Sequence, residues 1–122
     1  MQPSALFRCL GEEIRLTLLL LVRRHGELCV CELVEAVNAS QPKVSRHLAQ
    51  LRSCGLLQDC RRGQWVYYSV SPDLPAWVGG VLDLADDAHA AQLQGMEGRL
   101  QAMAGRPSLC NRPAGTAMGA QS

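Results

Sequence analysis

The sequence predicts a mostly helical domain with a single β-hairpin. Apolar residues recur at helical spacing through most of the first 53 positions, and two short segments rich in β-forming residues follow at 56–60 and 65–70. The chain has 122 residues, which suits one domain, and 48% of them are apolar, which is enough to build a core. We expect residues 1–104 to form the folded domain and residues 105–122, rich in Gly, Ala and Pro, to form a flexible tail.

Helix start and stop signals place the helices. Two glutamates open the second helix and three basic residues close it, an order that suits the helix dipole, and Gly26 follows as a stop. Ser40 is a good N-cap for the fourth helix, and Pro42 is tolerated in the first turn that follows. We expect five helices, over residues 4–10, 12–25, 27–37, 41–53 and 74–103.

Residues 56–60 and 65–70 are expected to pair as a hairpin, because the second segment alternates and is rich in β-formers. The segment Arg61-Arg62-Gly63-Gln64 between them is the expected tip, so that the tip carries two arginines. The element order is then helix, helix, helix-turn-helix, hairpin, helix. That order defines a winged helix-turn-helix with a helix added at each end.

Basic charge gathers in the middle of the chain although the net charge is only +1. Residues 41–64 hold five basic residues against Asp59 alone. Because DNA meets only one face of a protein, a local basic patch in a near-neutral chain suits nucleic-acid binding. The second helix of a helix-turn-helix enters the major groove with its N-terminal residues first. The candidate DNA contacts are Gln41, Lys43, Ser45 and Arg46 on the fourth helix, with Arg61 and Arg62 on the hairpin.

Three segments of the chain carry a specific pattern: LCVCEL at 28–33, SQPKVSRHL at 40–48 and RGQWVYY at 62–68. In this order and spacing they resemble the ArsR family of metalloregulatory repressors, over roughly residues 6–73. The resemblance implies a homodimer joined by its first and last helices and bound to an imperfect palindromic operator in double-stranded DNA. It also implies an inducer that lowers the affinity for DNA. The matching base-reading residues would be Gln41, Ser45 and Arg46, with Arg62 and Gln64 on the wing.

Cys29 and Cys31 are the candidate inducer ligands. They open the predicted third helix, where the dipole is expected to lower the thiol pKa and so favour the thiolate that selects soft ions. Residues two apart on a regular helix point about 200° apart, so both sulfurs reach one ion only if the first turn is irregular or unwinds. We therefore expect binding to distort the third helix and to shift the fourth. With the resemblance, the pair predicts trivalent arsenic or antimony as inducer, and no organic cofactor.

The third ligand is left open by the sequence. Family members with this motif often have a third cysteine three residues after the second, where this chain has Val34. Cys110, in the expected tail, is the first candidate because a flexible segment can reach the pair, and Cys9 on the first helix is the second. A site with two thiols and another donor is the third option. Cys54 and Cys60 are predicted to be packing residues.

Other functions fit the sequence less well. A thiol redox or persulfide sensor of the same fold would use widely separated cysteines, and relatives that sense cadmium or lead carry an N-terminal arm with extra cysteines. A metal carrier leaves the basic residues unexplained, and the chain has no Cys-x-x-Cys, phosphate loop or catalytic triad to support an enzyme.

The remaining titratable residues are expected to be structural. We place His25, His47 and His89 at helix ends or on the surface, and Asp83, Asp86 and Asp87 on the solvated face of a helix. Without a signal-peptide pattern or an apolar run of membrane length, the sequence predicts a cytoplasmic protein with no membrane partner.

Overall fold

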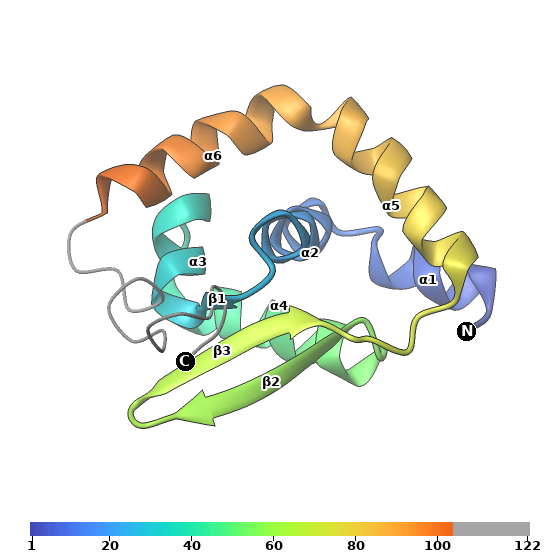
Figure 1. Cartoon of the computed structure of the whole chain (residues 1–122), viewed down its shortest axis with the longest axis horizontal. Coiled ribbons are helices and arrows are strands. Elements are labelled where there is room, and N and C mark those ends of the chain that lie inside the picture. The colour runs from blue at the N-terminus through green and yellow to red at the C-terminus, as the bar shows by residue number, and fades with distance from the viewer. Residues whose placement is uncertain (104–122) are drawn as a thin grey trace, which may run out of the picture.

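The computed structural model of the chain describes residues 1–103, which form helices around a small antiparallel sheet (Figure 1). The elements in chain order are α1 Pro3–Cys9, α2 Glu13–His25, β1 Leu28–Cys29, α3 Val30–Val37, α4 Gln41–Ser53, β2 Leu57–Arg62, β3 Trp65–Val70, α5 Ala76–Ala88 and α6 Ala90–Ala102. The predicted fold class, a winged helix-turn-helix with a helical segment added at each end, is confirmed. No helix within residues 1–103 is both long and apolar enough to cross a membrane.

The helix-turn-helix consists of α3, a short turn and α4. Asn38 adopts a left-handed conformation at the C-cap of α3, with a φ of 55° that asparagine tolerates better than most residues. Ser40 caps α4 as predicted, and its Oγ accepts a hydrogen bond from the Lys43 N–H at 3.4 Å. The predicted stripe of α4, Val44, Leu48 and Leu51, is fully buried in the core beside the buried central residues of α2.

The sheet has the order β1-β3-β2, and β2 and β3 pair from Leu57 opposite Val70 to Arg62 opposite Trp65. Gly63 and Gln64 are therefore the two turn residues, and Gly63 has a φ of +61°, which glycine adopts without steric cost. The expectation that both arginines lie in the tip is wrong. They belong to the last two positions of β2, where successive side chains point to opposite faces.

The third helix begins later than the sequence predicted. Residues 28 and 29 form β1, in which Leu28 pairs with Tyr68 and Cys29 with Tyr67 of β3. Cys29 is extended at the N-cap of α3, and the Glu32 side chain accepts a hydrogen bond from its N–H at 2.9 Å. This half of a capping box starts the helix at Val30 instead of residue 27.

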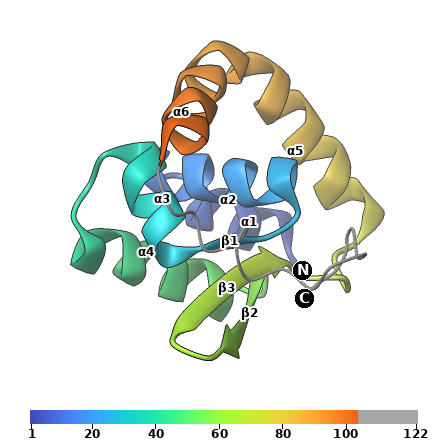
Figure 2. The ribbon, with the colours of Figure 1, turned by 60° about the vertical axis from the view of Figure 1, so that its left-hand side comes forward.

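The predicted last helix, residues 74–103, is in fact two helices that bend at His89. Together α5 and α6 form an arch over α2, on the side of the molecule away from the hairpin (Figures 1 and 2). The His89 backbone is not helical, and its Nε2 lies 3.1 Å from the Thr17 Oγ1 on α2. A straight helix over this span would extend roughly 45 Å. The bend lets both halves contact α2.

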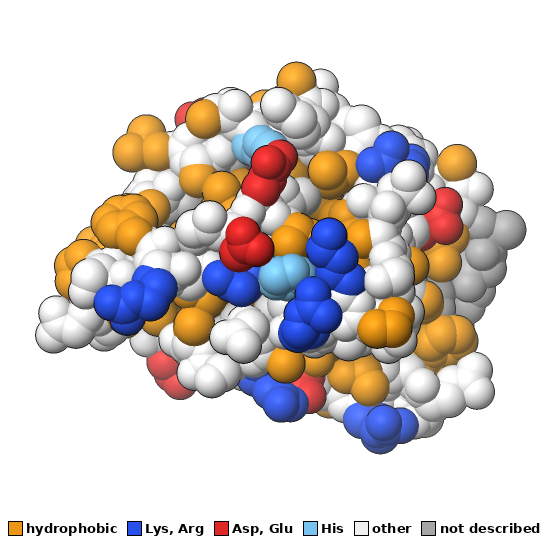
Figure 3. Space-filling model, turned by 180° about the vertical axis from the view of Figure 1, so that it is seen from behind, with side chains coloured by type: hydrophobic (Ala, Val, Ile, Leu, Met, Phe, Trp, Pro, Cys, Tyr) orange, Lys and Arg blue, Asp and Glu red, His pale blue; other side chains and the backbone are white. Residues whose placement is uncertain are grey.

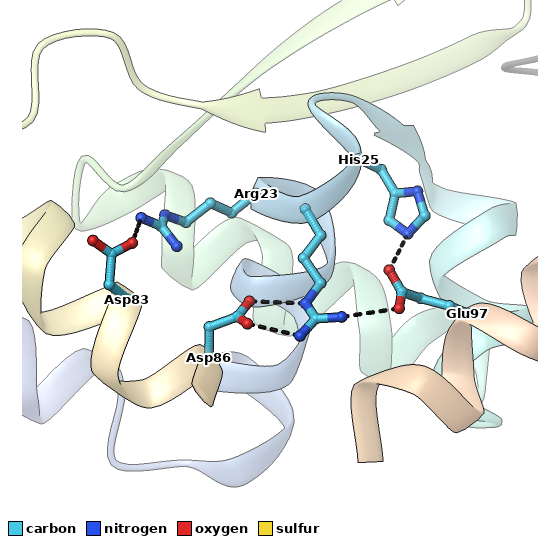
Figure 4. A network of polar contacts seen from close by, with 6 residues as sticks. Arg23, His25, Asp83, Asp86 and Glu97 are labelled. Atoms are coloured by element: carbon cyan, nitrogen blue, oxygen red, sulfur yellow. Dashed lines mark hydrogen bonds and ion pairs between the residues drawn. The ribbon is translucent and has the colours of Figure 1, made fainter. Parts of the chain in front are cut away.

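Ion pairs join the arch to the end of α2 (Figure 4). Arg24 makes two hydrogen bonds to Asp86, at 2.7 and 2.8 Å, and a third to Glu97 at 2.9 Å, while Arg23 pairs with Asp83. The Arg24 guanidinium holds the pKa of Asp86 below its usual value. The expectation that these aspartates form a solvated face is therefore wrong for Asp86, whose side chain is only 17% exposed.

Candidate DNA interface and thiol site

The first turns of α4 present the polar side chains that the sequence singled out. Gln41, Lys43 and Arg46 are exposed, and Ser45 is half-buried. The Gln41 Nε2 donates a hydrogen bond to the Ser45 Oγ at 2.7 Å, so the two side chains lie together on one face of the helix. The start of α4 is thus a polar, solvent-facing surface on a helix whose opposite face is locked into the core.

Basic side chains gather around a histidine on the face turned away from the viewer of Figure 1 (Figure 3). His47 lies among the charges of Arg15, Arg46, Lys43 and Glu12. The expectation that it is a surface residue is wrong, because it is 6% exposed and its Nδ1 lies 3.4 Å from the Arg15 guanidinium. Burial and the neighbouring positive charges lower the pKa of His47, so the uncharged form is favoured.

The two arginines of the hairpin have different surroundings. Arg61 and Gln64 are exposed. Arg62 turns back, pairs with Glu27 and lies with its guanidinium 4.0 Å from the centre of the Tyr67 ring. Arg62 therefore anchors the hairpin to the segment before β1.

Two of the five basic residues in the predicted patch are neutralised within the protein. Arg62 pairs with Glu27, and the exposed Arg52 lies 3.1 Å from Asp59. Within residues 1–103, no ion pair engages Lys43, Arg46 or Arg61.

Cys29 and Cys31 come together at the start of α3, with their sulfur atoms 2.8 Å apart. The expected 200° separation does not apply, because Cys29 is extended in β1 and only Cys31 lies on the helix. One small ligand can therefore contact both sulfurs while α3 keeps its conformation. The predicted distortion of this helix is not needed to assemble the pair.

The expectation that the helix dipole lowers the thiol pKa is also wrong for Cys29. Burial raises the pKa of the Cys29 thiol, and the hydrogen bond with Cys31 raises it further, although a hydrogen bond from the Glu32 backbone N–H to the Cys29 sulfur opposes the shift. Cys29 is 1% exposed, whereas Cys31 is half-buried. The Cys29 thiol therefore keeps its proton at neutral pH, and Cys31 lies nearer to solvent.

A hollow of about 280 Å³ opens beside the pair, between the start of α4 and the hairpin. Its lining consists of Cys29, Val30, Cys31, Gln41, Gln64, Trp65 and Val66. The hollow thus places the two sulfurs next to one candidate DNA contact on α4 and another on the hairpin.

The described residues supply no third ligand. Within residues 1–103, no three His, Cys, Asp or Glu side chains converge in a way that holds a metal ion. Cys110 lies outside the described residues. Cys9 instead lies beside Cys54, with which it lines a separate hollow, and Cys54 packs at the edge of the core as predicted. The expectation that Cys60 is a packing residue is wrong, because Cys60 is exposed on β2.

Three residues that the sequence analysis did not select shape these sites. Glu32 is fully buried and fixes the backbone of Cys29, Glu27 holds Arg62, and Trp65 lines the hollow. A glutamate three residues after a cap is a recognisable signal. This signal was not recognised in the sequence because the capping residue is a cysteine. The Glu27–Arg62 pair spans two distant segments and leaves no local signal.

The fold and the exposed polar start of α4 define a regulator of the winged helix-turn-helix class. Residues 12–59 match the family described as bacterial regulatory protein, arsR family. The arsenic resistance transcriptional regulator ArsR1 of Pseudomonas putida is 50% identical over 105 residues, which cover 86% of this chain and 82% of that protein. The chain therefore belongs to the ArsR family.

Two further comparisons agree with this assignment. The arsenical resistance operon repressor of Escherichia coli K12 is 52% identical over 83 residues, covering 68% of this chain and 71% of that protein. Among solved structures, the AntR antimony-specific transcriptional repressor is similar, with a TM-score of 0.61 and 30% identity. That similarity covers 75% of this chain and 79% of AntR.

Proposed function

We propose that this protein is a homodimeric transcriptional repressor that leaves its operator when trivalent arsenic or antimony binds Cys29 and Cys31. The observation that carries the proposal is the contact between the two sulfur atoms in a hollow that Gln41 and Gln64 also line. The names of the relatives in Pseudomonas putida and Escherichia coli, both tied to arsenic resistance, support the same inducer.

The start of α4 is suited to read base edges in the major groove. The Gln41 and Arg46 side chains are exposed and can each form paired hydrogen bonds with a purine, and the Ser45 hydroxyl can bond with either kind of base. Lys43 and Arg61, exposed and without ion pairs to other described residues, suit phosphate contacts. Arg62 and Gln64 complete the proposed contacts on the hairpin, with Arg62 exchanging Glu27 for phosphate.

Dimerisation through the first and last helical segments is supported by apolar side chains that the single chain leaves exposed. Phe7 on α1 is 56% exposed, and Leu84 on α5 is 73% exposed. Trp77, near the start of α5, is also exposed. A second copy would bury these large side chains, and a two-fold dimer matches a palindromic operator.

The chemistry of the pair favours an uncharged trivalent hydroxide over a divalent cation. A divalent cation needs thiolates, and burial opposes the loss of the proton from Cys29. Arsenite is uncharged at neutral pH and exchanges its hydroxides for thiols, with each thiol proton leaving in a molecule of water. Sulfur ligands also select soft elements. The donor set therefore fits trivalent arsenic or antimony.

The hollow offers a direct route from inducer to DNA. An arsenic atom bound to Cys29 and Cys31 would occupy space beside Gln41 and Gln64, which lie on the two elements proposed to contact DNA. A shift of either side chain would misplace its hydrogen-bond partners at the operator. Release then needs a displacement of the first turn of α4 relative to the hairpin, rather than unwinding of α3.

Cys110 is the proposed third ligand. The arch leads the chain toward the site, because α6 packs on α3 and the Arg99 Nε donates a hydrogen bond to the Ala36 carbonyl oxygen at 2.9 Å. The seven residues that follow Met103 and end at Cys110 reach at most about 25 Å. That length is ample to return along α3, a helix of eight residues, to the pair at its start.

The proposal is tested by fluorescence anisotropy of labelled DNA from upstream of the protein's own gene. The reduced protein should bind, and arsenite or antimonite should release it, whereas zinc and cadmium should not. Release should be lost in Cys29→Ser and Cys31→Ser, weakened in Cys110→Ser and unchanged in Cys60→Ser, the matched control. Release by an oxidant or a persulfide alone would contradict the inducer, and absence of operator binding would contradict the repressor.

A further inference from the structure

The fold creates a second pair of thiols that the sequence does not reveal. Cys9 is the last residue of α1 and is 5% exposed, and Cys54 is the half-buried C-cap of α4. Both cysteines line the same hollow, and they lie close enough for Cys54 to raise the pKa of the Cys9 thiol. Two helices that the chain separates by α2 and α3 thus bring their terminal cysteines into contact.

This pair is reachable from solvent. A hollow of about 330 Å³ opens beside it, lined by Ala5, Arg8, Cys9, Arg15, Gln50 and Cys54. The Arg15 Nε donates a hydrogen bond to the Cys9 carbonyl oxygen at 2.6 Å, and the Arg15 charge lies close enough to the Cys9 thiol to act on its pKa. The hollow therefore combines two thiols with positive charge at its wall.

We propose that Cys9 and Cys54 form a second binding site, for a small uncharged trivalent arsenical, separate from the Cys29–Cys31 pair. With arsenite, two As–O bonds break and two As–S bonds form to one arsenic atom. The two thiol protons leave with the two hydroxides as water, and no atom is oxidised or reduced. The hydroxyl that stays on arsenic is an acceptor for the Arg15 guanidinium.

The surroundings of the pair select an uncharged ligand over a metal cation. The positive charges of Arg8 and Arg15 at the hollow repel a divalent cation. Burial, together with the neighbouring Cys54 side chain, raises the pKa of Cys9 to about 12, so the thiol keeps its proton at neutral pH. A cation can bind this sulfur only after the thiol has lost its proton. A hydroxide on arsenic instead takes up the proton and leaves as water.

A bound arsenic atom would join the end of α1 to the end of α4. It would therefore link the helix proposed to form part of the dimer interface to the helix proposed to read DNA. The binding itself requires neither DNA nor the Cys29–Cys31 pair, so this site stands apart from the proposed function.

The test uses a full-length variant in which only Cys9 and Cys54 remain: Cys29→Ala, Cys31→Ser, Cys60→Ser and Cys110→Ser. The reduced protein is mixed with phenylarsine oxide, and the adduct is counted by native mass spectrometry. We expect one phenylarsenic group per chain. Adding Cys54→Ser should weaken retention roughly 100-fold or more, because one thiol cannot chelate. Cys54 suits this substitution because it is half-buried, and Cys9→Ala gives a second route to the same loss.

Circular dichroism establishes that each variant is folded before arsenic is added. A folded variant that takes up no arsenic, or uptake that survives both Cys54→Ser and Cys9→Ala, would overturn the proposal. The reciprocal protein, Cys9→Ala with Cys54→Ser, keeps the Cys29–Cys31 pair and reports on the proposed inducer site alone. The two proposed sites are therefore tested independently of each other.

Discussion

The reading side of the molecule, which comprises α3, α4 and the β2–β3 hairpin, differs sharply from the arch formed by α5 and α6. On the arch, most charged side chains have a partner, and Arg24 of α2 hydrogen-bonds to both Asp86 and Glu97 (Figure 4). On the reading side, Lys43, Arg46 and Arg61 have no ion-pair partner among residues 1–103.

Arginine therefore has two different roles in this small domain. The chain contains two Arg-Arg pairs, at residues 23–24 and 61–62, which look alike in sequence. The first pair fastens helices together, whereas the second divides, with Arg62 held by Glu27 and Arg61 left exposed. The difference teaches that a basic residue in the sequence indicates free positive charge only where the fold leaves it without an acidic partner.

The largest expected effect is on the thiol pair of the reading side. Cys31→Ser should raise the arsenite concentration needed for half-release of the operator roughly 100-fold or more, because the chelate is lost. Operator affinity without arsenite and thermal stability should stay close to those of the unsubstituted protein, because Cys31 is half-buried. Anisotropy and a thermal melt measure the two properties, and an unchanged arsenite response would refute the site.

The next largest effect is expected from the positive charges on α4 that have no ion-pair partner. Arg46→Ala should weaken operator binding by about 1–3 kcal/mol and relax specificity at one position of each half-site. Arg52→Ala, the matched control on the same helix, should cost less than about 1 kcal/mol, because Arg52 already pairs with Asp59 at the surface. Equal losses in the two variants would show that α4 contributes only general positive charge.

Substitutions in the ion pairs of the arch should change the stability of the protein instead of its DNA binding. Arg24→Ala should lower the free energy of unfolding by about 2 kcal/mol, because Asp86 and Glu97 lose charged hydrogen bonds in a mostly buried setting. Arg23→Ala should cost about 0.5 kcal/mol, since Asp83 is 67% exposed. Urea unfolding at one protein concentration measures both, and the comparison fails if Arg23→Ala is the more damaging.

The smallest effect concerns His47, which lies where α4 meets α2. Its pKa is lowered from the ordinary value of 6.5, so below that pH the unfolded chain binds a proton that the folded protein excludes. Stability should therefore fall as the pH drops below 6.5, and the loss should level off below the folded-state pKa. His47→Gln should show a shallower fall over this range in urea unfolding. Parallel curves would mean that His47 does not couple pH to stability.

Local patterns were sufficient to predict the reading helix. The spacing of Val44, Leu48 and Leu51 gave the buried face of α4, and Ser40 gave its start, because both signals lie within a few residues. The adjacent pair Cys29 and Cys31 was equally visible. Their approach to 2.8 Å was not, because it depends on a two-residue strand paired with β3. A strand of that length is too short to leave a periodic pattern.

The features that the sequence missed are contacts between distant segments. The bend at His89 accompanies its hydrogen bond with Thr17, a residue 72 positions earlier in the chain. The burial of His47 depends on α2. The Cys9–Cys54 contact joins the ends of two helices, and no spacing rule relates them. Each of these features depends on tertiary packing.

The most direct test of the central claim is X-ray absorption spectroscopy at the arsenic edge of the protein carrying one equivalent of arsenite. The Cys9→Ala and Cys54→Ser background isolates the pair on the reading side. We predict an arsenic atom bound by three sulfurs, falling to two sulfurs and one oxygen on Cys110→Ser. The account would be contradicted by an arsenic atom with fewer than two sulfur neighbours in this background. It would also be contradicted if the number of sulfur neighbours stayed the same after Cys31→Ser.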